Sequence, residues 1–547
     1  MKLPSAALPV RTNDDADWRF VNAATDASDP TSQTETPEKV RAGIIILASG
    51  DVGIGNSARM AFELIAKRNS MFHRGGCVVE LTREGSGLGL SIISAQSFRS
   101  KIEKFGTLAK YRTGAHGETL LTLNARLSLD GANAILAADE RLLLPAISGV
   151  YTAPVLLCDE TGLSVLPKGY HERCGGVLVT GGHEPHELRL GEAVEVLLDS
   201  LAEFDFTTPA DKSRAVAAMI SPALRFGRLL ETHFPLFVIE ADDSQAGKGY
   251  LLELIQTIYH ETPSSVPQRV GGVGSFDESL SQALERGNPF IEVGNIRGKI
   301  GSSFFEEMLT RPFGSTIAAR IPRKPEIQVD PAGFIFQLTS NGFESTRDLA
   351  NRSCIIRLRK RREHCFRRFA EGDLHDHVRA NQARFLGAVH AVVRAWHEQG
   401  AHRTNDLRGE GRFRHWAQTL DWIVRNIFAL PPLMDGHESA QERVSNPALT
   451  WLRALALVID QQGAIGDEQS VSRLAEIGED AGLPVPGVRE DATDERRRLA
   501  AGRVMGKIFC SADTIELDVF TVRRVAREEP RKDGNGYITL KNYIFTR

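Results

Sequence analysis

A short apolar run that leads through a polar loop into a lysine and a helix constrains this fold more than any other feature. The run Leu236–Ala241 is short and rich in strand formers, which is typical of a buried strand. Apolar residues then recur with the i, i+3, i+4, i+7 spacing of an amphipathic helix, at Leu251, Leu254, Ile255 and Ile258. Strand, loop and helix N-terminus together place backbone N–H groups and one cation around a phosphate. The sequence therefore predicts a phosphate-binding loop.

Seven consecutive loop residues are expected to bind the nucleotide: Asp243, Ser244, Gln245, Ala246, Gly247, Lys248 and Gly249. The match to the phosphate-binding motif has one departure at each end. Asp242 stands where the motif has its first glycine, and Gly249 stands where it has Ser or Thr. The second departure matters for chemistry, because that hydroxyl normally holds Mg²⁺.

Composition places the chain among ordinary globular proteins. Its 547 residues, 42% of them hydrophobic, are enough for three or four domains. The net charge of -4 hides a basic block, Arg357-Leu-Arg-Lys-Arg-Arg362, which favours nucleic acid. Six cysteines without a C-x-x-C pair indicate neither a zinc site nor a disulfide framework. No apolar run reaches the roughly 18 residues of a membrane span. We therefore expect a cytoplasmic protein with no membrane contact.

Periodicity and composition divide the chain into six parts. These are a disordered leader (1–41), an N-terminal mixed α/β accessory domain (42–185), a helical collar (186–230), a nucleotide-binding core with a parallel sheet (231–362), a helical region (363–466) and a winged-helix-like domain (467–547). The last part is predicted as two helices (471–482 and 493–509) and a hairpin of strands 514–525 and 537–545 with a basic tip. The tryptophans of the helical region are interpreted as core residues.

A nucleotide hydrolase of this kind needs an acid on a second strand to hold Mg²⁺ and polarise water. The candidate strand begins at Pro289, and it has Gly294 and Asn295 where an acid is expected. Strand alternation puts Glu292 on the same face as Gly294, so Glu292 is the candidate catalytic residue and metal ligand. An ordinary strand glutamate is the alternative interpretation.

Two further positions behind this strand carry candidate catalytic groups. A third strand, 334–338, leads to Asn341, whose amide could orient a water at the γ-phosphate. Arg352 follows next to another apolar run and could stabilise transition-state charge across a subunit boundary. Asn341 or Arg352 alone is a weak indication of a nucleotide hydrolase. Their order in the sequence after the phosphate-binding loop is more specific.

Between the second and third strands, a hairpin with a basic tip is predicted over 316–329. Its candidate DNA-binding residues are Arg320, Arg323 and Lys324, which could touch phosphates without reading sequence. A solvated charged turn is the alternative.

These stretches resemble a family, the superfamily 3 type AAA+ helicases, and within it the phage and mobile-element primase-helicases related to the poxvirus enzyme. The resemblance spans roughly 57–362 and is carried by the loop, by Gly271–Glu278, Asn288–Lys299, Phe336–Gly342 and Thr346–Arg352, and upstream by Met71–Gly76 and Gly169-Tyr170. It implies a P-loop AAA+ core in a homo-hexameric ring around single-stranded DNA, with ATP and Mg²⁺ as cofactors and replication proteins as partners. By resemblance, Lys248 is the phosphate lysine, Asn341 the sensor, Arg352 the finger, and Arg323 with Lys324 the tip of the hairpin that tracks DNA.

Two functions remain open at this point. The first is an ATP-dependent ring-forming DNA translocase or helicase that serves replication of a phage, plasmid or integrated element. The second is a hydrolysis-impaired, nucleotide-gated DNA-binding or assembly protein in replication initiation or element defence. Gly249 and Gly294 motivate the second, because both replace groups that hold or support Mg²⁺.

Overall fold

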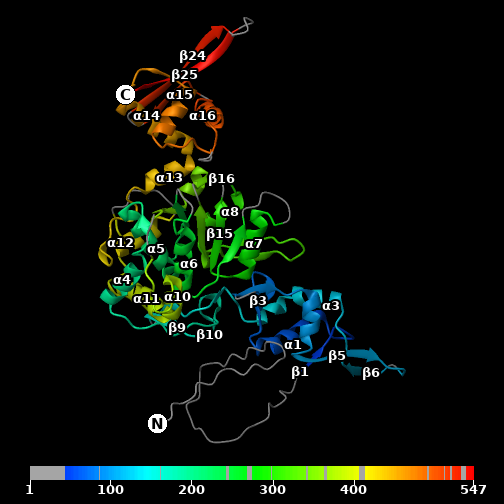
Figure 1. Ribbon diagram of the computed structural model, residues 1–547. Coiled ribbons are helices and arrows are strands. Elements are labelled where there is room, and N and C mark those ends of the chain that lie inside the picture. The colour runs from blue at the N-terminus through cyan, green and yellow to red at the C-terminus, as the bar shows by residue number, and fades with distance from the viewer. Residues whose placement is uncertain are drawn as a thin grey trace.

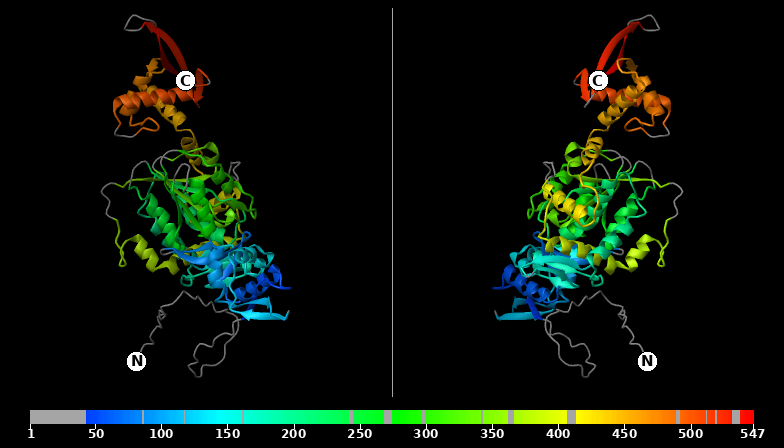
Figure 2. Two further views of the ribbon diagram at one scale, coloured as in Figure 1. Left: turned by 90° about the vertical axis from the view of Figure 1, so that its right-hand side faces the viewer. Right: turned by 90° about the vertical axis from the view of Figure 1, so that its left-hand side faces the viewer.

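The computed structural model describes the chain from residue 43 onward, with short gaps (Figure 1). The described ranges are 43–84, 87–116, 118–160, 162–241, 245–267, 274–296, 299–340, 343–361, 366–405, 413–488, 492–510, 512–517, 520–530 and 537–547. The predicted leader lies outside them. Three units follow one another along the molecule, with the central core between an N-terminal and a C-terminal unit (Figure 2).

A six-stranded sheet forms the centre of the core, in the order β12-β21-β13-β19-β15-β14. Its strands are β12 (Asp205–Phe206), β21 (Ser353–Arg359), β13 (Leu236–Ala241), β19 (Ile335–Ser340), β15 (Phe290–Ile296) and β14 (Ser264–Pro267). Five of them run parallel, and β12 joins the edge antiparallel to β21. The predicted parallel sheet is confirmed, and β13 lies inside it.

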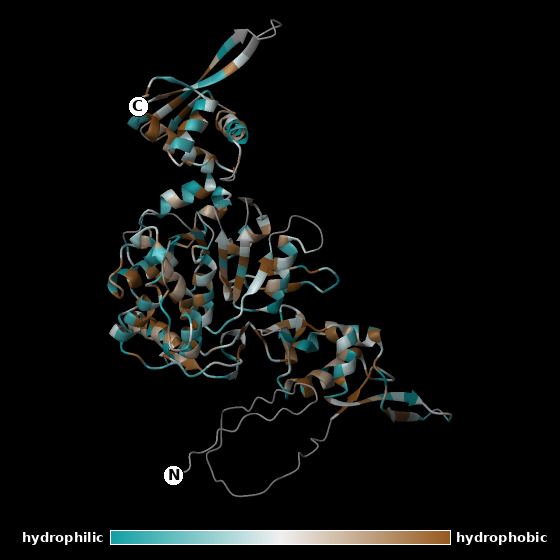
Figure 3. Ribbon diagram, in the orientation of Figure 1, coloured by the Kyte–Doolittle hydropathy of each residue, from teal (hydrophilic) through white to brown (hydrophobic). Residues whose placement is uncertain are grey.

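Strand β13 is buried along its whole length and feeds two hydrophobic clusters. Phe237 and Ile239 belong to the cluster on one face of the sheet, and Leu236 and Val238 to the cluster on the other. Figure 3 shows hydrophobic colour concentrated on the central strands and polar colour on the outer segments. A strand buried on both faces reads as a continuous apolar run, which is how the sequence identified it.

Helices cover both faces of this sheet. The first face carries α4 (Leu190–Ser200), α5 (Pro209–Phe226), α6 (Lys248–Ile258), α10 (Leu374–Ala380), α11 (Gln382–Glu398) and α12 (Arg414–Asn426). The second carries α7 (Phe276–Arg286), α8 (Ser303–Thr310), α9 (Arg347–Ala350), α13 (His437–Ser445) and the hairpin of β17 (Ile317–Ala319) and β18 (Ile327–Val329). A two-stranded pair, β16 (Lys299–Ile300) and β20 (Glu344–Ser345), adds to the core. No helix among the described residues is long and apolar enough to cross a membrane.

The predicted collar and helical region are therefore layers of the core. The stretch predicted as helical over 190–230 consists of two helices with strand β12 between them, and α5 is buried almost throughout. Thr208, two residues after the strand, is the N-cap of α5 and forms a capping box with Asp211. Propensity missed β12 because two residues pairing at a sheet edge leave no periodic signal.

The N-terminal unit has its own hydrophobic cluster, formed by residues 45–144. Its elements are β1 (Gly43–Ile46), α1 (Ile54–Ala66), β2 (Met71–Arg74), β3 (Cys77–Glu84), β4 (Gly87–Ile92), α2 (Ala95–Ile102), β5 (Gly106–Thr113), β6 (Thr119–Leu123) and α3 (Leu129–Ala137). Five short strands then pack against the core: β7 (Gly149–Tyr151), β8 (Val155–Asp159), β9 (Gly162–Leu166), β10 (Gly169–His171) and β11 (Val177–Val179). The predicted accessory domain is thus mixed α/β, with its last segment joined to the core.

The C-terminal unit packs three helices on a four-stranded antiparallel sheet. Its elements are α14 (Pro447–Gln461), β22 (Glu468–Ser470), α15 (Val471–Asp480), α16 (Asp494–Ile508), β23 (Thr514–Leu517), β24 (Phe520–Pro530) and β25 (Tyr537–Thr546). The single strand predicted over 514–525 is wrong, because β23 and β24 pair antiparallel across it. Helix α14 shares this unit's cluster, so the unit begins about twenty residues earlier than predicted. The basic tip lies outside the described residues.

The tryptophans are core residues, as predicted. Trp396, Trp416 and Trp451 are buried, and Trp422 is partly buried against the same cluster as the first two. Trp416 donates from its indole N–H to the Ser221 hydroxyl at 2.8 Å, which ties α12 to α5. A buried indole with a satisfied donor is a packing element.

One buried histidine makes the stability of this core depend on pH. Burial, assisted by Arg394, lowers the pKa of His390 on α11 to about 3. The unfolded side chain titrates near pH 6.5, so between these values the unfolded chain binds more protons than the native one. Stability is therefore lost as the pH falls from about 6.5 towards 3.

We expect His390→Leu to flatten this dependence by about 1.4 kcal/mol per pH unit below pH 6. The measurement is urea unfolding of wild type and variant at pH 7, 6, 5 and 4. The matched control is His415→Leu on α12, where the side chain is exposed. A wild-type-to-variant difference that stays constant with pH would contradict the assignment.

Candidate nucleotide-binding site

The predicted loop lies at the carboxyl edge of the central sheet, between β13 and α6. Strand β13 ends at Ala241, and α6 begins at Lys248, as the sequence predicts. The residues with helical spacing on α6 are all fully buried under the sheet. Of the seven predicted nucleotide ligands, Asp243 and Ser244 lie outside the described residues. Gln245 to Gly249 are described and form the turn into the helix.

Gly247 gives the loop its backbone conformation. It adopts φ 87°, a left-handed value that favours glycine, and it is the N-cap of α6. No side chain caps this helix end, and its first turn carries no acidic residue. The first amides of a helix have no acceptor within the helix, and the dipole adds partial positive charge there. Lys248 stands at the first helical position, so cation and amides converge where a phosphate would sit.

Gly249 leaves room for a larger side chain. A Cβ built on it meets no atom within 4 Å, and the residue is exposed. The missing Ser or Thr is therefore a chemical difference from the phosphate-loop motif, without any steric compensation around it. The fold would accept a hydroxyl at this position.

The prediction of a catalytic and metal-binding role for Glu292 is corrected by the register of the sheet. Glu292 on β15 pairs with Gln337 on β19, and Gln337 pairs with Phe237 on β13. Phe237 is four residues before the end of β13. At about 3.3 Å per residue this leaves Glu292 about 13 Å behind the loop. Its carboxylate accepts a hydrogen bond from Gln256 Nε2 at 3.1 Å, two turns along α6 from Lys248. Glu292 is on the α6 face, but it is too far back to hold a metal at the phosphates.

A β-bulge follows Glu292 at the carboxyl end of β15. Val293 pairs with Leu338 and Ile296 with Ser340, so β15 has one residue more than β19 at the carboxyl edge. Bulges change the direction of side chains and are common next to active sites. Gly294 lies in this bulge, and a Cβ built on it also meets nothing within 4 Å. An acid would fit at Gly294, as a hydroxyl would at Gly249.

The acid that does lie beside the loop is Glu240, which the sequence analysis did not identify. It is fully buried at the end of β13, and both of its oxygens accept from Arg443 of α13, at 2.7 and 2.6 Å. A bidentate guanidinium pair of this kind satisfies a carboxylate that would be costly to bury alone. Glu240 thus links the loop strand to the helix that precedes the C-terminal unit. The apolar run around it concealed this acid.

Aromatic side chains stand next to the loop. Phe204 lies 3.6 Å from a Cβ built on Gly247, and its ring centroid is 6.2 Å from that of Tyr250 on α6. His375 stacks on Tyr250 with ring centroids 3.7 Å apart and donates to the Tyr250 carbonyl at 2.9 Å. Burial raises the pKa of Tyr250. Sequence reasoning missed this cluster because its members come from three separate segments.

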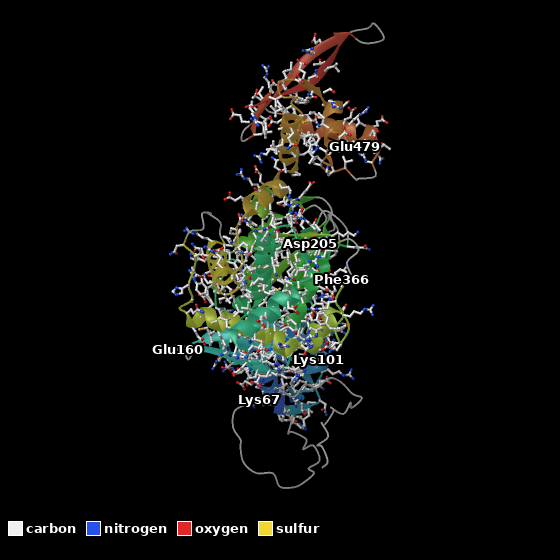
Figure 4. The ribbon with its side chains drawn as sticks, turned by 60° about the vertical axis from the view of Figure 1, so that its left-hand side comes forward. Lys67, Lys101, Glu160, Asp205, Phe366 and Glu479 are labelled. Carbon is white, nitrogen blue, oxygen red and sulfur yellow. The ribbon has the colours of Figure 1, made fainter. Side chains whose placement is uncertain are left out.

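An open groove follows β21 on the same side of the core. It is lined by residues 366–373, and Phe366 is 65% exposed there. Arg367 anchors the segment by pairing with Asp199 of α4, with distances of 3.0 and 2.6 Å. Figure 4 labels Phe366 and Asp205 on the central body, between Glu479 of the C-terminal unit and Lys67 and Lys101 of the N-terminal unit.

Of the other two predicted catalytic residues, the structure describes Arg352. Asn341 is outside the described residues, directly after Ser340, which is level with Glu240 at the loop edge. Arg352 precedes β21 at the amino edge, where its carbonyl accepts from the Leu236 amide. Ala241 at the end of β13 pairs with Leu358 on β21. Leu358 is six residues after Arg352, which is a distance of about 20 Å along the strand. Arg352 therefore cannot reach the loop of its own chain.

Acidic partners hold Arg352 in place. Its guanidinium is 3.1 Å from Asp348 and 4.0 Å from Glu306, and the side chain is 19% exposed. Asp348 is itself exposed, so this part of the pairing is exchangeable with another anion.

The predicted hairpin exists, and its three basic residues have different surroundings. Lys324 binds the buried carboxylate of Glu285 on α7, with both oxygens at 2.8 Å. Arg320 pairs with Glu326 at 2.8 Å on the exposed surface. Arg323, at φ 65°, is exposed at the turn and forms no ion pair with a described residue. Lys324 is thus engaged in holding the hairpin to α7, which leaves Arg323 as the exposed cation of the tip.

Comparisons with known proteins find similar solved structures at low identity. The C-terminal region of NrS-1 matches 88% of this chain and 98% of its own at 12% identity, with a TM-score of 0.33. The match to the SCCmec type IV Cch helicase covers 86% of this chain and 97% of that one, with 10% identity and a TM-score of 0.31. The match to JCV helicase covers 47% of this chain and 71% of that one, with 12% identity and a TM-score of 0.20. No protein-family model matches the chain, and no curated protein does either.

We expect Gly249→Ser to strengthen Mg²⁺-dependent nucleotide binding about tenfold, because a hydroxyl there supplies the missing metal ligand. Titration of Mg²⁺ at fixed nucleotide measures the change. Gly249→Ala is the matched control, since it adds the Cβ and the helix propensity without the oxygen. Equal effects of Ser and Ala would show that the site is not at this end of α6.

Proposed function

We propose that this chain is an ATP-dependent DNA translocase or helicase that works as a ring of identical subunits. The observation that carries the proposal is the separation of Lys248 and Arg352 across one parallel sheet. The loop occupies the carboxyl edge, and the arginine occupies the amino edge about 20 Å away. A complete site with both groups requires two copies of the chain, in head-to-tail contact. Head-to-tail contacts form a ring when the rotation between subunits closes, and we infer a closed hexamer.

ATP and Mg²⁺ are the proposed cofactors. The N-terminal turn of α6 and Lys248 would hold the phosphates, and the aromatic cluster of Phe204 and Tyr250 offers apolar surface for the base. Asn341 would orient water from the end of β19, as proposed from sequence. The metal would add positive charge between the terminal phosphates. The part of the chain that the structure describes holds no group of three His, Cys, Asp or Glu residues suited to a metal.

DNA is the proposed polymer, bound without reading its sequence. Arg323 at the hairpin turn is one contact, and Arg320 can exchange its exposed partner for a phosphate. The C-terminal unit adds a cationic stripe on α16, where Arg496, Arg503 and Lys507 are exposed at helical spacing. The proposed setting is replication of a phage, plasmid or integrated element, with other replication proteins as partners.

A nucleotide-gated assembly protein that hydrolyses ATP poorly is the second candidate. The open space at Gly249 and Gly294 favours it, because the chain has no side-chain oxygen at either of these positions. Steady-state ATP hydrolysis with and without single-stranded DNA separates the two functions, with Lys248→Ala as the blank. DNA-stimulated turnover supports the motor, and turnover equal to the blank with nucleotide still bound supports the switch.

A mixing experiment tests the shared site. Lys248→Ala lacks the loop lysine and Arg352→Ala lacks the finger, whose loss costs about 10³-fold in turnover or more. Each variant alone should be inactive, whereas an equal mixture should regain activity at about one quarter of its interfaces. Arg347→Ala is the control, since Arg347 is exposed on the short helix α9 that precedes Arg352. A mixture as inactive as its components would contradict a site built from two subunits.

Arg323→Asn should weaken single-stranded DNA binding and lower the salt slope by about 0.7, as expected for one lost phosphate contact. Asparagine tolerates the left-handed turn, so the hairpin is kept. The measurement is fluorescence anisotropy of a labelled oligonucleotide between about 50 and about 200 mM salt. Arg347→Asn is the control, and an unchanged slope in Arg323→Asn would remove the hairpin from the DNA path.

A further inference from the structure

A cavity of about 200 Å³ lies on the side of the core that faces the N-terminal unit. It is bounded by β2, by the segment around β7, by the end of α5 and by the loop between β18 and β19. These parts come from both units, since β2 belongs to the N-terminal cluster's sheet and α5 to the core. The cavity is remote from the nucleotide loop, because the β18–β19 loop precedes the amino edge of the sheet.

Three arginines line the cavity, and two of them are buried. Arg74 is 6% exposed and donates through Nη1 to the carbonyls of Leu284 and Glu285, at 3.0 and 2.6 Å. Arg225 is 9% exposed and donates to the carbonyls of Thr232 and Pro331, at 2.8 and 3.3 Å. Backbone carbonyls position both groups but do not neutralise their charge.

The lining has three arginines and one carboxylate, and Glu285 near Arg74 and Asp330 near Arg225 offset only part of the positive charge. Neither Arg74 nor Arg225 forms an ion pair with a carboxylate of the described residues, and the third arginine, Arg228, adds another positive charge. The single carboxylate in the lining is Asp330, whose Oδ1 accepts from the Ala332 amide at 2.8 Å. Burial lowers the pKa of both buried arginines to about 10, which is the sign of desolvated cations.

Neutral polar groups complete the lining. Ser148, Thr316 and Gln328 line the same space as the arginines.

We propose that this cavity is a binding site for a phosphate group, either free phosphate or the phosphate of a mononucleotide. The charge of a phosphate compensates that of the arginines that line the cavity. Guanidinium groups match phosphate geometry better than any other side chain, which favours this anion over a halide. The volume admits a phosphate with a small substituent and excludes a polymer.

An occupant would connect the two units. Gly75 follows Arg74, and its carbonyl accepts from the Gln328 amide of β18 at 3.0 Å, so the units already touch here. A Cβ on Gly75 would lie 1.9 Å from the Gln328 carbonyl, which shows how tight this contact is. A phosphate held by Arg74, Arg225 and Arg228 would therefore stabilise the junction between the N-terminal unit and the core.

The test is calorimetric titration of inorganic phosphate and of AMP into the full chain carrying Lys248→Ala, which removes competition from the nucleotide loop. One binding event is expected, with Arg228→Glu in the same background weakening it about tenfold or more. Arg228 is exposed, so this change spares the core, and Arg228→Gln should give a smaller loss. Arg225→Lys keeps the charge but replaces the guanidinium with an ammonium, which matches phosphate geometry less well, and it should also weaken binding.

The two ligands separate the sources of the phosphate. AMP that binds about tenfold more tightly than phosphate identifies a mononucleotide, and equal or weaker AMP binding identifies free phosphate. The proposal is overturned if phosphate binds only when Lys248 is present, or if binding is the same in Arg228→Glu. It is also overturned if single-stranded DNA competes for the Arg228-dependent site, since a polymer does not fit the cavity. None of these outcomes depends on ATP hydrolysis.

Discussion

Strand β13 has to be buried on both faces, and the arrangement of the core follows from that requirement. The helices of residues 190–226 and 374–426 cover one face of the sheet, and they lie on either side of the loop in the sequence. Helices α7 and α8 and the hairpin cover the other face. The strand also carries an acid, Glu240, which can be buried only because Arg443 reaches it from α13. The same strand therefore fixes the position of the loop and joins it to the start of the C-terminal unit.

Parallel pairing gives the core a direction that its proposed chemistry uses. All carboxyl ends meet at the edge where α6 begins, and all amino ends meet at the edge that carries Arg352. Loop lysine and arginine are consequently kept apart within one chain and can meet only between two chains. The proposed phosphate cavity lies towards the amino edge as well, between the core and the N-terminal unit. Contacts between subunits and contacts between units would thus share one side of the sheet.

The sequence predicted what local patterns encode. Strand β13, helix α6, the parallel sheet and the buried tryptophans follow from hydrophobic periodicity and were correct. Pairing between distant residues was not predictable in this way. The register of β15 places Glu292 behind the loop, the ion pair with Glu285 engages Lys324, and a two-residue strand interrupts the predicted collar. Arg443, the aromatic cluster and the arginine-lined cavity come from segments far apart in the chain, so no single window contains their signal.

The two glycines can be explained physically as a single feature. Gly249 and Gly294 lie at the start of α6 and at the end of β15, and both have open space where an oxygen-bearing side chain would fit. If glycine were required for packing, a Cβ built at these positions would lie close to neighbouring atoms. No atom lies within 4 Å of such a Cβ at either position. What these residues change is therefore the number of protein oxygens available to Mg²⁺, which favours a metal held mainly by the phosphates. Such a site would bind nucleotide through Lys248 and the helix amides, and its turnover would depend on how firmly a neighbouring Arg352 completes it.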